Sequence, residues 1–146
     1  MSDIDIRLNI IPPTTTAQQK GVFVRGGRAH FFVKKNVRDA ENFLAAMLQA
    51  YTPPNPFAGA VELCATWVFP YRKSEPKRNT AAGAYIPHTS RPDLDNLEKG
   101  LLDVLTRLRF WADDSQVAQK KTIKAWGARP FLHIHIREIH TKEAAQ

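Results

Sequence analysis

Regular alternation of hydrophobic and polar residues near the start of the chain predicts a β-strand. From residue 4 to residue 10, isoleucine or leucine occupies each even position and polar residues occupy the odd positions. This two-residue period is typical of a strand that buries one face. Pro12 and Pro13, which have no backbone N–H to donate, mark its end.

A β-hairpin is predicted next. The runs GVFVR at 21–25 and RAHFFVK at 28–34 are rich in β-branched and aromatic residues, and Gly26 and Gly27 separate them. Glycine takes the positive φ angles of a tight hairpin turn at little steric cost, so the two runs are expected to pair.

Two stretches carry hydrophobic residues at helical spacing. In the first, from Asn36 as the predicted N-cap to Tyr51, apolar residues recur every three or four positions, and prolines follow from Pro53. In the second, 94–108, leucine and valine form one stripe, which predicts an amphipathic helix. The stripe consists of Leu94, Leu97, Leu101, Val104, Leu105 and Leu108.

Three further segments are predicted to be strands. Residues 60–70, AVELCATWVFP, are dense in β-branched and aromatic residues and are expected to form a central strand covered on both faces. Strands are also predicted at 116–126 and 130–138, separated by Gly127 and Pro130.

The rest of the chain is predicted to be irregular. Residues 72–91 contain five basic side chains, one acid and no sustained periodicity, which predicts a mobile basic loop, and the tail 140–146 is expected to fray. The order of elements, βββαβαββ, indicates an α+β fold with one mixed sheet and two main helices. With 146 residues, the chain is expected to form a single domain spanning 1–146.

The overall charge favours a polyanionic partner. The chain has 21 Lys and Arg against 14 Asp and Glu, a formal net charge of +7. Nucleic acid is the partner that such a surface attracts, although a positive face is also found on proteins that bind none. The one cysteine, Cys64, excludes an internal disulfide and a zinc site built on paired thiols. The sequence has no membrane-length apolar run and no signal peptide, so a cytoplasmic location is expected.

Acidic residues are concentrated in one part of this basic chain. Six of the 14 acids lie between residues 93 and 114, and they are Asp93, Asp95, Glu98, Asp103, Asp113 and Asp114. Carboxylate oxygens are the hard ligands that Mg²⁺ prefers. The hypothesis is that Asp93, Asp95 and either Asp113 or Asp114 hold a divalent cation.

Helical geometry adds a possible partner to this group. Asp95, Lys99 and Asp103 share the side of the second helix opposite the leucine stripe. Lys99 is therefore placed to orient a nucleophile or to stabilise charge on a phosphate, or to pair with Asp95.

A structural interpretation of the same acids stays open. Asp93 suits a helix N-cap, and Asp95 in the first turn is favoured by the helix dipole and by an i,i+4 pair with Lys99. Asp-Asp-Ser at 113–115 is ordinary turn chemistry.

The stretch RPDLDNLEKGLLDVLTRLRFWADDSQV, residues 91–117, resembles the RusA family of Holliday junction resolvases. The hallmark of that family is Asp-x-Asp-Asn-Leu-x-Lys at the start of a helix that ends near an Asp-Asp pair. By this resemblance Asp93, Asp95 and Asp114 are metal-binding catalytic carboxylates, Lys99 is the catalytic lysine and Asp113 is an auxiliary acid.

The resemblance implies a homodimeric endonuclease that depends on Mg²⁺, with Mn²⁺ as a possible substitute. Such an enzyme resolves four-way DNA junctions by paired symmetric cuts, in recombination and repair, and suits a phage or prophage. Two departures from the family are the run TTTAQQ after Pro13, where members often have Ser-Asn, and the longer segment 72–91.

Several other residues are candidates for contacts with nucleic acid. Tyr85 or Phe110 could stack on exposed bases or belong to the core. His133 and His135 lie on one strand face, where a structural role is favoured over a metal pair. The predicted phosphate contacts are Lys73, Lys77, Arg78, Arg91, Lys120 and Lys124.

Two other functions remain open from the sequence. One is a non-catalytic nucleic-acid-binding module in which the aspartates cap a helix and shape a turn. The other is a Mg²⁺-dependent nuclease that acts on another branched DNA.

Overall fold

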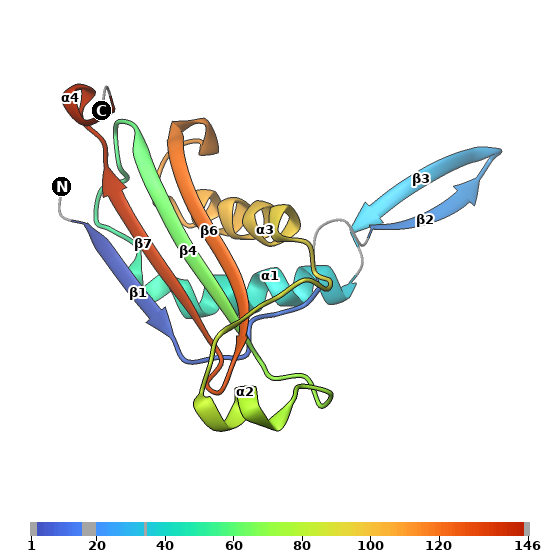
Figure 1. Ribbon diagram of the computed structural model, residues 1–146. Coiled ribbons are helices and arrows are strands. Elements are labelled where there is room, and N and C mark those ends of the chain that lie inside the picture. Colours follow the sequence, from blue (N-terminus) through green and yellow to red (C-terminus); the bar gives the residue numbers. More distant parts are fainter. Residues whose placement is uncertain (1–2, 16–19, 34, 145–146) are drawn as a thin grey trace.

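A five-stranded mixed sheet forms the centre of the protein, and two helices cover one of its faces (Figure 1). The computed structural model describes residues 3–15, 20–33 and 35–144. In spatial order the strands are β1 (Ile4–Leu8), β7 (Phe131–Glu138), β4 (Val61–Pro70), β6 (Val117–Gly127) and β5 (Ile86–Pro87). Only the β4 and β6 pair is parallel. The α+β fold and the central place of β4 are confirmed.

The two covering helices are α1 (Lys35–Leu48), which continues into the 3-10 turn η1 (Gln49–Tyr51), and α3 (Leu94–Arg107). Both agree closely with the predicted helices. The helix α1 begins one residue before the predicted N-cap Asn36, whose side-chain oxygen accepts a hydrogen bond from the N–H of Val37 at 3.0 Å.

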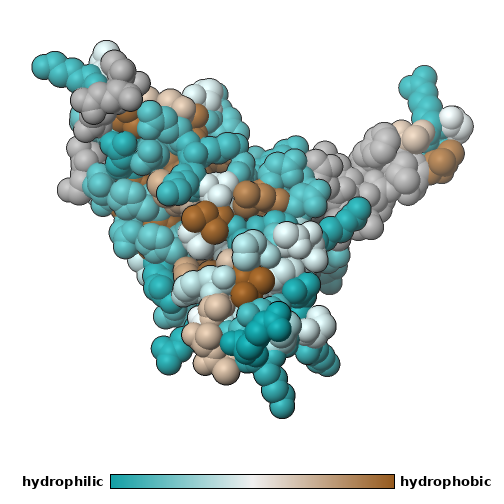
Figure 2. Space-filling view, in the orientation of Figure 1, coloured by the Kyte–Doolittle hydropathy of each residue, from teal (hydrophilic) through white to brown (hydrophobic). Residues whose placement is uncertain are grey.

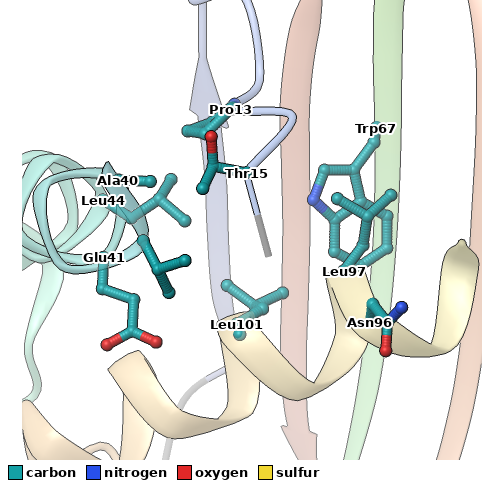
Figure 3. Close-up of a pocket in the computed structure, with 11 residues that line it drawn as sticks. Pro13, Thr15, Ala40, Glu41, Leu44, Trp67, Asn96, Leu97 and Leu101 are labelled. Atoms are coloured by element: carbon teal, nitrogen blue, oxygen red, sulfur yellow. The ribbon is translucent and has the colours of Figure 1, made fainter. Parts of the chain in front are cut away.

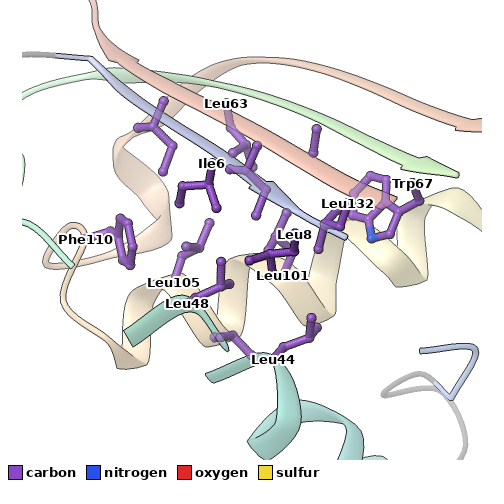
Figure 4. Packing of buried hydrophobic residues seen from close by; sticks show 14 of the residues in the cluster. Ile6, Leu8, Leu44, Leu48, Leu63, Trp67, Leu101, Leu105, Phe110 and Leu132 are labelled. Atoms are coloured by element: carbon purple, nitrogen blue, oxygen red, sulfur yellow. The ribbon is translucent and has the colours of Figure 1, made fainter. Parts of the chain in front are cut away.

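The hydrophobic core lies between the sheet and these helices, as Figure 4 shows. Alternate residues of β4, including Leu63 and Trp67, are buried on the helix side, where they meet Leu101 and Leu105 of α3 and Leu48 of α1. At roughly 25 cal/mol per Å² of buried apolar surface, this packing fixes the rotation of α3 about its own axis. The polar side of α3 therefore faces away from the core.

The predicted hairpin is present but does not join the main sheet. Strands β2 (Lys20–Arg25) and β3 (Arg28–Val33) pair only with each other, and Gly26 and Gly27 have φ angles of 59° and 76°. The hairpin extends away from the rest of the protein (Figure 1). The expectation of one sheet was wrong for these strands, because a turn sequence determines local pairing but not long-range pairing.

The segment 72–91 is more ordered than its sequence indicated. It contains the helix α2 (Lys77–Ala82) and the strand β5, which pairs with β6. The Tyr71 hydroxyl donates to the carbonyl of Ala84 at 2.5 Å, which closes the base of this segment. The prediction of an irregular loop was wrong, while its mobility stays a prediction. The tail likewise contains a short helix, α4 (Thr141–Ala144).

The other face of the sheet is polar. His133 lies 2.8 Å from Asp5 and His135 lies 3.3 Å from Asp3, across β7 and β1. These pairs support the structural interpretation of the two histidines. Figure 2 shows a largely hydrophilic surface with separate hydrophobic patches. Among the described helices, none has the length and hydrophobicity needed to cross a bilayer.

Candidate active site

A cleft with a volume of about 190 Å³ lies between α3, the start of β6 and the 3-10 turn η2 (Asp114–Gln116). We call it the acidic cleft. Its lining residues are Asp95, Glu98, Lys99, Leu102, Asp103, Asp114 and Lys120. The structure thus brings together three of the four predicted catalytic residues, Asp95, Lys99 and Asp114, and the predicted phosphate contact Lys120.

One wall of the acidic cleft is the polar side of α3. Asp95, Lys99 and Asp103 follow one another at intervals of four residues and are exposed. Leu97 and Leu101, on the opposite side of the helix, are buried in the core. The side chains that line the cleft are therefore oriented by hydrophobic packing behind them.

The opposite wall is the turn that carries Asp114, and Gln116 fixes its position. The Gln116 side-chain oxygen accepts hydrogen bonds from the N–H groups of Ala112 and Asp113, at 2.9 and 3.2 Å. Its amide group donates to the carbonyls of Phe57 and Gly59, at 2.8 and 2.9 Å. One side chain thus holds the turn against the loop before β4. Gln116 belongs to this turn, whereas the sequence placed it at the start of the predicted strand 116–126.

Glu98 and Lys120 connect α3 to β6, the strand that follows the turn of Asp114. The Lys120 ammonium lies 2.6 Å from the Glu98 carboxylate, which also accepts a hydrogen bond from the Thr122 hydroxyl. Glu98 is buried, with 8% of its surface exposed. The sequence did not single out Glu98 as functional, because its partners lie more than 20 residues away in another element.

Lys124 likewise connects β6 to the loop that leads into α3. Its ammonium group donates to the carbonyls of Ser90 and Pro92, at 2.5 and 2.8 Å. Lys120 and Lys124 were predicted to extend a positive surface for phosphates. Both lie on the helix side of the sheet and have partners within the protein, while half of the Lys120 side chain is exposed, so their contact with phosphate stays a prediction. The remaining predicted phosphate contacts, Lys73, Lys77, Arg78 and Arg91, are exposed.

The structural interpretation of the acids holds for Asp113, and in part for Asp95, which lies in the first turn of α3, where the helix dipole favours an acid. Asp113 accepts a hydrogen bond from the Ser115 hydroxyl at 2.9 Å and precedes η2. Asp93 occupies the N-cap position of α3, but its side chain makes no capping hydrogen bond. Within the described residues, Asp95 and Lys99 form no ion pair. The carboxylates of Asp93 and Asp95 are thus not used as caps or partners in the fold.

The two aspartates of the turn influence each other. A hydrogen bond to Asp113, partial burial and the negative charges of Asp113 and Asp103 raise the pKa of Asp114. The Ser115 hydroxyl, followed by the contact with Asp114, lowers the pKa of Asp113. Crowded carboxylates of this kind favour a bound cation.

Mg²⁺ suits the donor set of the acidic cleft, since one or two carboxylates with water molecules are enough to bind it. Asp95 and Asp114 supply two such groups from opposite walls, and Asp103 lies beside them. Asp93 is not among the lining residues. In the described part of the chain, no three Asp, Glu, His or Cys side chains lie close enough to hold one ion. A role for Asp93 in metal binding stays a prediction.

Other features are less suited to catalysis. The pocket between α1, α3 and Pro13 (Figure 3) is largely apolar and has a volume of about 30 Å³, room for one or two water molecules. Phe110 is fully buried, so of the two roles left open by the sequence it has the one in the core. Tyr85 is 63% exposed, and its stacking stays a prediction.

The sequence of this chain is similar to a known protein family and to several known proteins. Residues 11–137 match the family described as Endodeoxyribonuclease RusA. A crossover junction endodeoxyribonuclease from Lactococcus phage r1t is 32% identical over 137 residues, which cover 94% of this chain and 98% of the phage protein.

Two further relatives were found. An uncharacterized protein, YqaN, from Bacillus subtilis is 28% identical over 120 residues, 80% of this chain and 84% of that protein. The crossover junction endodeoxyribonuclease RusA of Escherichia coli strain K12 is 45% identical over 40 residues, 27% of this chain and 33% of that protein.

Proposed function

The chain belongs to the RusA family of endodeoxyribonucleases, and we propose that it resolves four-way DNA junctions by Mg²⁺-dependent hydrolysis of phosphodiester bonds. The family membership confirms the resemblance found in residues 91–117. The proposal extends this membership to substrate, metal and biological role, which is recombination and repair of DNA.

The observation that carries the proposal is the acidic cleft. Asp95 and Lys99 face Asp114 across it, on a chain whose net charge is +7. Acidic groups beside phosphate are unfavourable for binding alone, because like charges repel. Their presence in a basic protein is explained if they hold a cation that the reaction requires.

The residues of the cleft have separable tasks in this proposal. Asp95 and Asp114 would hold Mg²⁺, which neutralises charge on the scissile phosphate and lowers the pKa of the attacking water. Lys99, one helical turn after Asp95, donates to a phosphate oxygen whose negative charge grows in the transition state. Glu98 and Gln116 have a positioning role, because their polar groups bind β6 and the loop before β4 and so hold α3 and the turn of Asp114 in place.

The test is cleavage of an end-labelled synthetic four-way junction beside a linear duplex of the same sequence. The wild type is assayed with EDTA, with Mg²⁺ and with Mn²⁺, next to Asp95→Asn and Asp114→Asn. Asp39→Asn is the matched control, because Asp39 is an exposed acid on α1 outside the cleft. We expect metal-dependent nicking of the junction by the wild type and the control only.

A binding assay distinguishes a variant that has lost catalysis from one that no longer recognises the junction. In gel shifts, Asp95→Asn and Asp114→Asn should bind the junction at least as tightly as the wild type, because each removes a negative charge near phosphate. A wild type that binds the junction but never cuts it with either metal would point to a non-catalytic module. Equal cutting of flaps and junctions would indicate a nuclease for branched DNA in general.

We also propose that the enzyme acts as a homodimer in the cytoplasm. A four-way junction has approximate two-fold symmetry, so a dimer with two-fold symmetry presents two active sites to two equivalent phosphates. Light scattering after gel filtration measures the mass in solution. On a supercoiled plasmid with a cruciform, paired cuts within one binding event give linear product directly, whereas independent cuts give nicked circles first.

A further inference from the structure

A second pocket opens next to the loop that leads into α3. It has a volume of about 350 Å³ and includes Phe69, Arg72, His88, Ser90, Arg91 and Trp126 among its lining residues. We call it the stacking pocket. It shares no residue with the acidic cleft.

Flat side chains form a column along one side of this pocket. The rings of His88 and Trp126 are stacked, with centroids 4.1 Å apart and an angle of 17° between their planes. The guanidinium carbon of Arg72 lies 4.0 Å from the centroid of the Trp126 ring. Trp126 is 4% exposed, so its ring is largely covered by its neighbours, which include His88 and Arg72.

The column is held in place by neighbouring residues. The guanidinium group of Arg72 lies 2.9 Å from the carboxylate of Glu75, whose side chain is 2% exposed and which also accepts a hydrogen bond from Asn79 at 2.7 Å. The Ser90 N–H donates to Nδ1 of His88 at 3.3 Å, so Nε2 carries the proton of the neutral ring. Burial, followed by the positive charge of Lys124, lowers the pKa of His88 and keeps it neutral. Such preorganisation lowers the entropic cost of binding a ligand.

The composition and size of the pocket indicate its ligand. A planar guanidinium group stacked on an aromatic ring is a platform for a flat ring, and 44% of the Arg72 side chain is exposed. Arg91 adds a second cation, and Ser90 adds a hydroxyl group. A volume of about 350 Å³ is at the small end of the range for ligand pockets and admits one nucleotide but no duplex.

We propose that the stacking pocket receives one unstacked nucleotide of the DNA substrate, with its base on the exposed side of the Arg72 guanidinium group, which itself stacks on Trp126, and with its phosphate at Arg91. This inference rests on the proposed function, because it assumes a branched DNA substrate. Unpaired or easily unstacked bases occur where the arms of a junction meet, and base stacking on side chains is a general means of holding single strands.

The loop from Ser90 to Asp93 leads from the pocket into α3, which forms one wall of the acidic cleft. Arg91 is two residues before Asp93, and Lys124 donates hydrogen bonds to the carbonyls of Ser90 and Pro92. A nucleotide in the pocket therefore fixes the register of its strand relative to Asp95. A preference for one base at a fixed distance from the cut is the expected consequence.

The experiment replaces single bases of the four-way junction, one position at a time, by fluorescent 2-aminopurine. The DNA is mixed with Asp95→Asn protein, which blocks cleavage and preserves binding. We expect one position in each symmetric half of the junction to change its emission on binding. That change should be lost when Arg72→Ala or Arg72→Lys is added.

Arg72→Lys separates stacking from charge. It keeps the positive charge and a partner for Glu75, but an ammonium group offers no flat surface. If the base stacks, Arg72→Lys weakens junction binding about tenfold, close to Arg72→Ala, and leaves the slope of affinity against salt unchanged. The matched control is Arg38→Ala, an exposed arginine on α1 outside the pocket.

Two results would overturn the inference: wild-type affinity for Arg72→Lys, or emission changes that the Arg72 variants leave intact. Thermal unfolding shows whether each variant is folded at the assay temperature, and the 2-aminopurine scan with intact Arg72 tests the pocket even if a variant is unstable. The wild type could cleave the junction while no 2-aminopurine position shows an emission change that depends on Arg72. That result would reject the stacking pocket and leave the proposed function standing. Absence of cleavage would reject the proposed function instead.

Discussion

Replacing Glu98 by alanine is expected to loosen α3 from β6 and thereby to open the acidic cleft. The buried carboxylate accepts hydrogen bonds from the Lys120 ammonium, at 2.6 Å, and from the Thr122 hydroxyl. The variant removes both contacts and leaves Lys120 without its partner. Because Asp95 and Lys99 flank Glu98 on the same helix, the position of both should become less defined.

The size of the effect follows from burial. A hydrogen bond to a charged group contributes about 1.5 to 3 kcal/mol, but half of the Lys120 side chain is exposed, which reduces the ion-pair share to about 0.5 to 1 kcal/mol. Adding the Thr122 contact gives a loss of about 2 kcal/mol in the free energy of unfolding. For a domain of this size that corresponds to a fall in Tm of roughly 4 to 8 °C.

The assay is urea unfolding of a double-mutant cycle made of Glu98→Ala, Lys120→Met and the double variant. We expect a coupling free energy of about 1 kcal/mol between the two side chains, and slower junction cleavage by Glu98→Ala even where it is fully folded. Additivity of the two changes within about 0.5 kcal/mol would refute the reasoning, because it would show that the pair does not join the two elements.

Three further outcomes are expected. Gln116→Ala removes the side chain that holds the turn of Asp114, so the cleavage rate should fall about 10²-fold in single-turnover kinetics, with little change in junction affinity by gel shift. Gly127→Ala would place a methyl group 2.8 Å from Cγ1 of Val68, so urea unfolding should show a loss of about 1 to 3 kcal/mol. His88 has a lowered pKa in the folded protein, so the unfolded chain binds its proton first as the pH falls through about 6.5, and stability drops. The free energy of unfolding should therefore fall less between pH 7 and pH 5 in His88→Phe than in the wild type.

Local patterns were sufficient for most of the secondary structure. The alternation at residues 4 to 10 and the stripe from Leu94 to Leu108 correspond to β1 and α3, because the spacing of apolar residues directly reflects the geometry of a strand or a helix. The segment 72–91 lacks such a pattern. Its helix and strand depend on contacts that are specific to the fold, such as the pairing of β5 with β6.

The candidate site was predictable in part for the same reason. Asp95, Lys99 and Asp103 share a helix, so their common direction follows from a period of 3.6 residues. Asp93 occupies the N-cap position of α3, but its side chain makes no capping hydrogen bond. The sequence could not predict this absence, because Asp is favoured at an N-cap whether or not its side chain forms the bond.

The sequence by itself determined the two helices, the main strands, the basic charge and the acidic hallmark of the family, since each depends on residues that are close together in the chain. Only the tertiary structure decided that Gln116 holds the turn of Asp114, that Glu98 binds Lys120 and that Arg72, Trp126 and His88 form one column. These groups come from elements that are far apart in sequence. Their meeting depends on strand order and on how the helices pack against the sheet, which no local pattern records.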